Sequence, residues 1–376
     1  MPASTAYSRF SAGLMLLFLA FIVAAISFGG FFEKWTFRDG TKFSAIAMMD
    51  GTAERPFVYR QLLPTLANIA DRLTPAVIKA KFQNALAENP QKRNMILRFF
   101  PNATESADTQ NLLRYYALFG LTFLSMLLAI FAMRYLCMLL YHDSSAATLA
   151  AFAMALLFPI LLTEGGYFYD LPELLFMALA VILAWQGRWL LLAIVTALAT
   201  YNKESFLFFV VTLYPLLRTR FSRKASLLIE AGLLVIAAAI NIAVKWRYAV
   251  NPGEIAQSQL LSHLLWLLRP TSYLEFEVNY GFPTPKGFNI INVLLLVFLF
   301  HNAWRHFPTA FKQHLYIALA INLPLFLAFC YQGELRNLSM LNMGLLMAIM
   351  VNISLLLQRH YAGRVALPLH LPDGRA

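Results

Sequence analysis

Ten apolar runs alternate with polar connections along the chain. The first covers residues 11–32, which is long enough for one membrane crossing, because a spanning helix needs about 20 residues. The other nine cover residues 115–140, 146–162, 171–186, 189–200, 206–217, 225–244, 288–300, 315–330 and 338–357. The pattern predicts an all-α polytopic membrane protein of about ten transmembrane helices, with residues 1–376 as a single integral-membrane domain.

Two of the polar connections are long. Residues 33–114 form the first, which we expect to be partly helical with interfacial helices. Residues 245–287 form the second, in which 259–268 has the composition of an interfacial helix.

Basic residues predict the orientation. If the N-terminus is cytoplasmic, the inner segments carry only two acidic residues, Asp143 and Asp373. They carry these basic residues: Arg9, Arg188, Arg218, Arg220, Arg223, Lys224, Arg305, Lys312, Arg359, Arg364 and Arg375. This positive-inside bias predicts that both termini are cytoplasmic and that the two long connections are outside.

Residues 201–205 interrupt the apolar segment 189–217. As one helix this segment would be about 43 Å long, which exceeds a hydrocarbon core of about 30 Å. As two arms of about 18 Å each, it would leave Lys203 and Glu204 at membrane depth. Charges there cost about 2.5–3.5 kcal/mol each and usually mark a functional cavity. The alternative is that Lys203 snorkels to the interface with Glu204 as its companion.

Composition agrees with a membrane protein. Hydrophobic residues make up 60% of the chain and charged residues 13%, and the mean hydropathy is +0.61. The net charge of +11 follows largely from the inner basic residues, and no segment resembles a nucleic-acid-binding module. Cys137 and Cys330 both lie in apolar runs, so neither a disulfide framework nor a zinc site is expected.

The candidate site consists of charged and tyrosine side chains in four connections on the predicted outer face. Each group also has an ordinary structural interpretation: a helix N-terminus at Asp170, a solvated turn at 334–336, and an interfacial loop at 33–64. Their convergence on one face predicts a pocket. Its candidate residues are Asp39, Arg60, Tyr169, Asp170, Lys203, Glu204, Glu334 and Arg336.

This set of residues favours one kind of chemistry. Only His263 of the seven histidines lies in an outer segment, so neither a Ser-His-Asp triad nor a His-based metal site is expected there. A carboxylate can deprotonate an acceptor hydroxyl, while Arg and Lys hold a phosphate leaving group. The absence of a Gly-rich phosphate loop fits a lipid phosphate donor better than a nucleotide.

The succession of motifs resembles the GT-C superfamily of integral-membrane glycosyltransferases. An N-terminal helix is followed by Asp39 with Phe43 one turn later, then by the segment Pro-Phe-Val-Tyr-Arg-Gln-Leu-Leu-Pro at 56–64, the Tyr169-Asp170 turn and the Lys203-Glu204 break. The resemblance covers most of the chain in layout, through short motifs. It implies transfer of a sugar, with inversion, from a polyprenyl-phosphate donor to a lipid- or glycan-linked acceptor at the outer face of a bacterial inner membrane.

The resemblance implies that Asp39 corresponds to the catalytic carboxylate that members of the superfamily carry in their first loop. Members often carry two acidic residues close together there, whereas Glu33 and Asp50 lie at a distance from Asp39 in this sequence. Two points therefore stay open: whether Asp39 or Asp50 is the base, and whether a divalent cation is bound. No other cofactor is implied.

Other functions also fit the pattern. A transporter or flippase of an anionic lipid would need buried Lys and Arg, although no internal repeat is evident. An envelope polysaccharide polymerase or ligase would share the large outer connections. A purely structural membrane subunit would have little use for charges inside the membrane.

Overall fold

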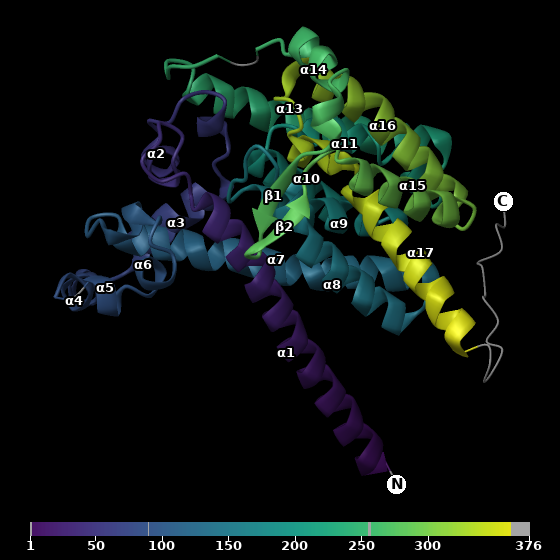
Figure 1. The fold of residues 1–376 in the computed structure, drawn as a ribbon, viewed down its shortest axis with the longest axis horizontal. Helices are drawn as coiled ribbons and strands as arrows, with labels where there is room; N and C mark the ends of the chain where they lie inside the picture. The colour runs from purple at the N-terminus through teal and green to yellow at the C-terminus, as the bar shows by residue number, and fades with distance from the viewer. Residues whose placement is uncertain (1, 89, 255–256, 362–376) are drawn as a thin grey trace.

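The structure, a computed structural model, describes residues 2–88, 90–254 and 257–361, which are mostly helical (Figure 1). Each predicted apolar run lies mostly on helix. The helices of these runs are α1 (Pro2–Trp35), α7 (Leu112–Tyr141), α8 (Ser144–Leu161), α9 (Asp170–Gln186), α10 (Trp189–Asn202), α11 (Phe206–Val211), α12 (Tyr214–Leu217), α13 (Arg223–Arg247), α15 (Ile290–Trp304), α16 (Thr309–Phe329) and α17 (Asn342–Tyr361).

Six helical segments among the described residues are long and apolar enough to cross a membrane. They are Ser11–Trp35, Leu112–Tyr141, Ser144–Leu161, Arg223–Arg247, Thr309–Phe329 and Leu335–His360. The chain therefore has the character of a multi-pass membrane protein, whereas the predicted number of ten spans is not established because the remaining apolar helices are shorter. The orientation also stays a prediction; of the residues on which it rests, Asp373, Arg364 and Arg375 lie outside the described residues.

Helix α9 lies at the centre of the bundle. It packs against α7, α10, α12 and α17, and the side chains along its first four turns are almost all buried. A helix that is apolar on every side is stable only when it is enclosed in this way. Its N-terminal turn carries the two acidic residues Asp170 and Glu173, so their carboxylates are placed inside protein.

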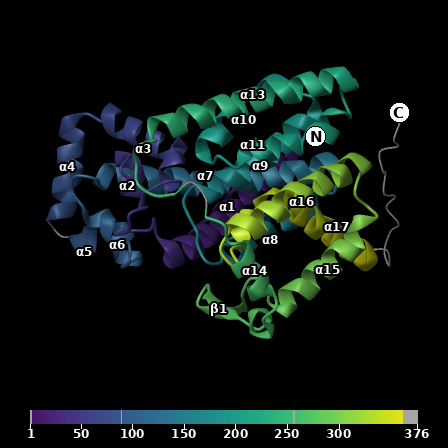
Figure 2. The ribbon, with the colours of Figure 1, turned by 90° about the horizontal axis from the view of Figure 1, so that it is seen from above.

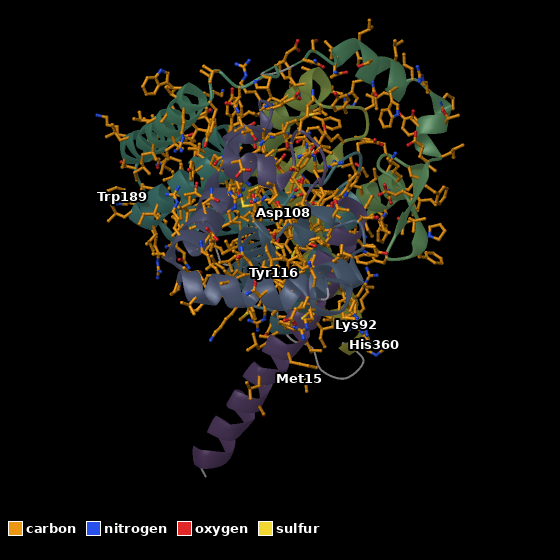
Figure 3. All side chains as sticks on the ribbon, turned by 90° about the vertical axis from the view of Figure 1, so that its left-hand side faces the viewer. Met15, Lys92, Asp108, Tyr116, Trp189 and His360 are labelled. Atoms are coloured by element: carbon orange, nitrogen blue, oxygen red, sulfur yellow. The ribbon has the colours of Figure 1, made fainter. Side chains whose placement is uncertain are left out.

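The N-terminal half of α1 projects away from the other helices (Figures 1 and 3). Its large apolar side chains are exposed, as at Met15, which is 59% exposed, and Phe18. Near its C-terminal end Phe28, Phe31 and Phe32 are buried. An apolar helix surface that no protein covers is what lipid would cover, which agrees with the membrane character of this helix.

The first long connection is partly helical, as predicted. Its elements are α2 (Ala45–Asp50), η1 (Phe57–Tyr59), α3 (Leu62–Leu73), α4 (Ala76–Ala87), α5 (Pro90–Arg93), α6 (Met95–Phe99) and η2 (Thr104–Ala107). Helix α3 buries Leu62, Leu63 and Ala67 and packs against α7. From above, α4 and α5 lie at one end of the molecule, beyond α3 (Figure 2).

The second long connection contains a small sheet that the sequence analysis did not predict. Its elements are α14 (Leu260–Leu267), η3 (Pro270–Tyr273), β1 (Phe276–Asn279) and β2 (Phe282–Pro285). The strands pair antiparallel through a turn in which Tyr280 and Gly281 both have positive φ. The Tyr280 ring lies against Gly30 of α1, where a β-carbon would come within 2.4 Å of it. Lys34 pairs with Glu277 at 2.7 Å, so the hairpin is fixed to α1.

The predicted break between the two arms of 189–217 is present. Helix α10 ends at Asn202, and Lys203 then takes an extended conformation with φ −155° and ψ 123°. The chain resumes as α11 and α12. Helix η4 (Leu335–Leu341), before α17, brings Arg336 within 3.4 Å of Asp170 at the start of α9.

Candidate functional site

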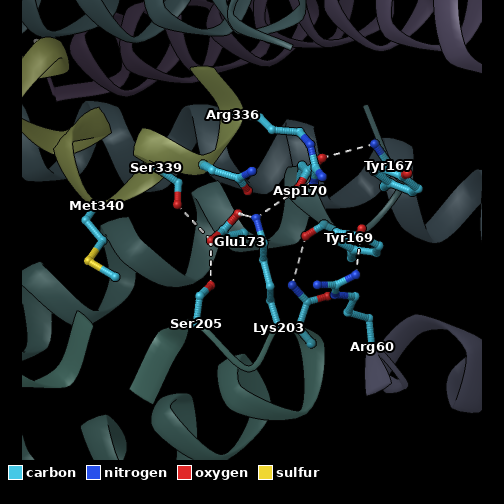
Figure 4. A network of polar contacts seen from close by, with 12 residues as sticks. Arg60, Tyr167, Tyr169, Asp170, Glu173, Lys203, Ser205, Arg336, Ser339 and Met340 are labelled. Carbon is cyan, nitrogen blue, oxygen red and sulfur yellow. Dashed lines mark hydrogen bonds and ion pairs between the residues drawn. The ribbon is translucent and has the colours of Figure 1, made fainter. Parts of the chain in front are cut away.

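Seven of the eight predicted site residues form one largely buried polar network, part of which is drawn in Figure 4. They come from four separate parts of the chain: the end of η1, the start of α9, the break after α10, and the segment that begins η4. They are Arg60, Tyr169, Asp170, Lys203, Glu204, Glu334 and Arg336, whereas Asp39 lies outside the network.

Lys203 lies at the centre of this network. Its Nζ is 3.1 Å from Oδ1 of Asp170 and 2.6 Å from Oε2 of Glu173, and its side chain is 5% exposed. Ser339 donates a hydrogen bond of 2.9 Å to the other oxygen of Glu173. The lysine is therefore enclosed by two carboxylates and does not have Glu204 as its companion.

Glu204 pairs instead with Arg60. The two make a bidentate contact, with Nη2 to Oε1 at 2.7 Å and Nε to Oε2 at 3.2 Å. Arg60 Nη1 also donates to the hydroxyl of Tyr169 at 3.2 Å, and its guanidinium lies over the ring of that residue. This planar arrangement uses the fork geometry of arginine, which a lysine could not reproduce.

Arg336 joins the network to the segment before α17. Its Nη2 and Nε donate to Oε1 of Glu334 at 2.6 and 2.9 Å, and its Nη1 is 3.4 Å from Oδ1 of Asp170. Its guanidinium lies 4.6 Å from the centre of the Tyr167 ring, which stacks on Tyr169. Asp170 is therefore shared between Lys203 and Arg336.

The charges of this network almost balance. Three cations, Arg60, Lys203 and Arg336, face four carboxylates, those of Asp170, Glu173, Glu204 and Glu334. Buried ions are tolerated only when paired and hydrogen-bonded. Since each of the three cations has a carboxylate partner, the network first of all fixes the relative positions of its segments.

Arg38 is the cation that differs. Its guanidinium lies 4.4 Å from the Trp35 ring and 4.7 Å from the Tyr167 ring. Among the described residues it has no carboxylate partner, and its Nε is buried without a hydrogen bond. Both Arg38 and Arg336 lie within 3.5 Å of the position that a β-carbon would take at Gly165, so the two guanidinium groups are neighbours.

The backbone around Arg38 is strained. Thr36 and Arg38 both have positive φ, at 47° and 61°, a conformation that costs about 1 kcal/mol or more for a residue with a side chain. Such strain often occurs at functional sites. Here it directs the Arg38 side chain toward Tyr167 while the next side chain, that of Asp39, contacts other elements.

Asp39 binds the start of η2 and the side of α7. Its Oδ2 accepts a hydrogen bond from the Glu105 backbone N–H at 2.9 Å, and the Tyr115 hydroxyl is 3.0 Å from both carboxylate oxygens. Glu105 in turn accepts from the Gly40 N–H at 2.9 Å. A second acidic residue therefore does accompany Asp39, but it comes from the far end of the first connection.

The environment of these two carboxyl groups changes their acidity. Burial raises the pKa of Asp39 above its ordinary value, and its hydrogen bonds only partly oppose this. Burial and the neighbouring charge of Asp39 raise the pKa of Glu105 as well. A raised pKa makes a carboxylate a stronger base near neutral pH.

Asp50 is in a more open place than Asp39. It is paired with Arg114 at 2.6 Å, and its side chain is 41% exposed. It lines a pocket of about 490 Å³ together with residues of α3, Tyr201 and the end of α13. The two candidate bases are thus in different surroundings: Asp39 is enclosed and hydrogen-bonded, and Asp50 faces a groove.

Sequence reasoning gave no role to three residues of this region. Glu173 follows Asp170 by three positions, which places both on one face of α9, so helical spacing could have indicated it. Arg38 is adjacent to Asp39 and lies three residues after Trp35, but nothing local shows that it lacks an acidic partner. Glu105 is 66 residues from Asp39, and no sequence signal connects them.

Comparison of the chain with models of protein families, with curated proteins and with solved structures finds no match. In the part of the chain that the structure describes, no three His, Cys, Asp or Glu side chains gather in a way that could hold a metal ion.

Proposed function

We propose that this protein is an inverting membrane glycosyltransferase that moves a sugar from a polyprenyl-phosphate donor to a hydroxyl of a lipid- or glycan-linked acceptor. The reaction takes place at the outer side of a bacterial inner membrane, with both termini cytoplasmic. Six apolar helices and the buried charges beside them support the membrane location. The other functions that fit the sequence are distinguished by the experiment below.

The observation that carries the proposal is the guanidinium of Arg38. It is partly enclosed by Trp35 and Tyr167, lies beside Arg336, and has no carboxylate partner among the described residues. An arginine held in this way is suited to bind an anion, because the oxygens of the anion would accept hydrogen bonds from its N–H groups. A phosphate at this place would contact Arg38 directly, with Arg336 next to it.

The network of Lys203 and Arg60 then has a supporting role. Lys203 is saturated by Asp170 and Glu173, and Arg60 by Glu204. A phosphate could bind Lys203 only by displacing a buried carboxylate, which is costly. These residues therefore orient Tyr167, Tyr169 and Arg336 around the phosphate.

Asp39 is the proposed base. It removes the proton from the acceptor hydroxyl as the oxygen bonds to the anomeric carbon, and the bond from that carbon to the phosphate oxygen breaks. The electron pair leaves with the polyprenyl phosphate, whose charge Arg38 stabilises. The turn at residues 36–40 thus carries the base and the phosphate-binding cation on adjacent residues.

The test uses purified full-length protein with a radiolabelled polyprenyl-phosphate sugar and an extract of envelope glycans as acceptor. We expect release of polyprenyl phosphate together with labelled glycan. Asp39→Asn should reduce turnover about 100- to 10,000-fold, because general base catalysis contributes on that scale. Asp50→Asn is run beside it to test the other candidate base, and it should retain turnover.

Three outcomes would change the assignment. Loss of turnover in Asp50→Asn with full turnover in Asp39→Asn would move the base to Asp50. Donor binding without release of polyprenyl phosphate, but with movement of the lipid across a vesicle membrane, would indicate a flippase. Transfer of a whole polysaccharide from its lipid carrier would indicate a ligase.

A further inference from the structure

A polar groove runs along α3, separate from the buried network. A pocket of about 490 Å³ lies between α3, the end of α10 and the end of α13. A second pocket of about 380 Å³ continues it toward the start of α7, and the two share Met49, Asn68 and Arg72 as lining residues.

One wall of the groove is the polar face of α3. Gln61, Thr65, Asn68 and Arg72 follow at spacings of four, three and four residues, which places them on one side of the helix. The opposite wall includes Tyr201, whose hydroxyl is 2.8 Å from that of Thr65. Such a surface is unsuited to an acyl chain and suited to a ligand with many polar groups.

The groove carries an excess of positive charge. Its acidic residues are already neutralised, Asp50 by Arg114 at 2.6 Å and Asp71 by Lys79 at 2.7 Å. Among the described residues, the side chains of Arg72 and Arg247 make no hydrogen bond or ion pair, and the Arg247 guanidinium lies 5.4 Å from the centre of the Tyr248 ring. Two arginine side chains thus face the larger pocket without a carboxylate of the protein.

The side-chain amides of Gln61 and Asn251 line the groove and can accept hydrogen bonds from a ligand. The Gln61 Nε2 donates to the carbonyls of Met48 and Val58, and the Asn251 Nδ2 donates to those of Gly51 and Ala53. Within the described part of the chain, their amide oxygens receive no donor, so they can accept from the hydroxyls of a ligand.

We propose that this groove binds an acidic sugar of the acceptor, remote from the reacting hydroxyl. Arg72 and Arg247 would bind its carboxylate or phosphate group, and Gln61 and Asn251 would accept from its hydroxyls. The assignment to the acceptor rests on the proposed glycosyltransferase function. Binding of a distant part of a substrate can position the reacting part, which is what such a site would contribute.

The experiment measures binding without any donor. The full-length chain is placed in uncharged phosphatidylcholine nanodiscs and titrated with trigalacturonate, with mannose 6-phosphate, and with uncharged maltotriose. We expect trigalacturonate or mannose 6-phosphate to bind more tightly than maltotriose, and more weakly as salt is added. In an Arg72→Met/Arg247→Met variant the affinity for the anionic sugar should fall about tenfold, because two exposed charge-assisted contacts are lost.

Arg269→Met is the matched control, because Arg269 is an exposed arginine of the second long connection that lies outside the groove. It should bind as the wild type does. Anionic-sugar affinity within twofold of wild type in the double variant, or no binding of either anionic sugar to the wild type, would overturn the proposal. The proposal would also be overturned if the double variant lost only its binding to phosphatidylglycerol and kept its affinity for the anionic sugar. Arg72 and Arg247 would then be lipid anchors.

The result separates the two proposals. If anionic sugars bind in the groove but no polyprenyl phosphate is released in the transfer assay, the glycosyltransferase function is wrong and the binding site stands. If transfer occurs and the double variant has an unchanged KM for the acceptor, the groove is not an acceptor site.

Discussion

Lys203 and Arg38 both lie beside the stacked rings of Tyr167 and Tyr169, yet their surroundings are opposite. Lys203 is 5% exposed and held by two carboxylates. Arg38 lies over Tyr167 and has no carboxylate among the described residues. A cation that is fully paired stabilises the protein. A cation that is held between aromatic rings and has no acidic partner is available to bind a ligand. Burial of a charge is therefore not by itself evidence of a binding role.

The largest expected effect comes from removing the paired cation. Lys203→Met would leave Asp170 and Glu173 buried without their shared partner, which should lower the free energy of unfolding by about 3–5 kcal/mol. Thermal unfolding of the purified variant in detergent measures this. Lys42→Met is the control, because Lys42 is 80% exposed and its pair with Glu54 should contribute less than about 1 kcal/mol. Equal unfolding temperatures for the two variants would show that the network does not hold the fold together.

A smaller change tests the environment of the unpaired cation. In Gly165→Ala the new β-carbon would lie 2.8 Å from the present position of Arg38 Nη2, so the guanidinium must move. We expect weaker donor binding, by roughly tenfold, corresponding to about 1.4 kcal/mol, with little change in stability. Gly120→Ala in α7 is the control, because no atom lies within 4 Å of its β-carbon position. Unchanged donor affinity in Gly165→Ala would show that the position of Arg38 is unimportant.

The smallest expected effect is on the pH dependence of the protein's stability. Asp39 and Glu105 have pKa values raised above 3.8 and 4.5, so the folded protein binds their protons more tightly than the unfolded chain does. Their contribution to stability is complete below these ordinary values and is lost as the pH rises through the raised ones. Unfolding temperatures measured from about pH 3.5 to about pH 7 should therefore fall less in Asp39→Asn/Glu105→Gln than in the wild type. A steeper fall in the variant would contradict the raised pKa values.

The sequence was sufficient to predict the helical membrane character, the break at Lys203 and the partly helical first connection. These features follow from local periodicity and from the length of apolar runs, which a single sequence contains. The hairpin β1–β2 was missed, although Tyr280 and Gly281 form its two-residue turn, because the strands beside that turn are only four residues long.

The pairing of charges could not be predicted in the same way. Lys203 and Glu204 are neighbours in sequence, but the extended conformation at Lys203 directs them to different partners, Asp170 with Glu173 and Arg60. Glu105 reaches Asp39 only because η2 folds back on the first turn of the connection. Such partners depend on tertiary packing between segments that are far apart in the sequence.

The central claim is that Arg38 binds the phosphate of the donor, and the most direct measurement is the affinity for polyprenyl phosphate. Arg38→Met should bind it about 10- to 150-fold more weakly than the wild type, because one charge-assisted contact is lost, while its unfolding temperature stays nearly the same. Arg269→Met should bind it normally. Affinity of Arg38→Met within twofold of the wild type would contradict the account, and the phosphate would then have to bind elsewhere.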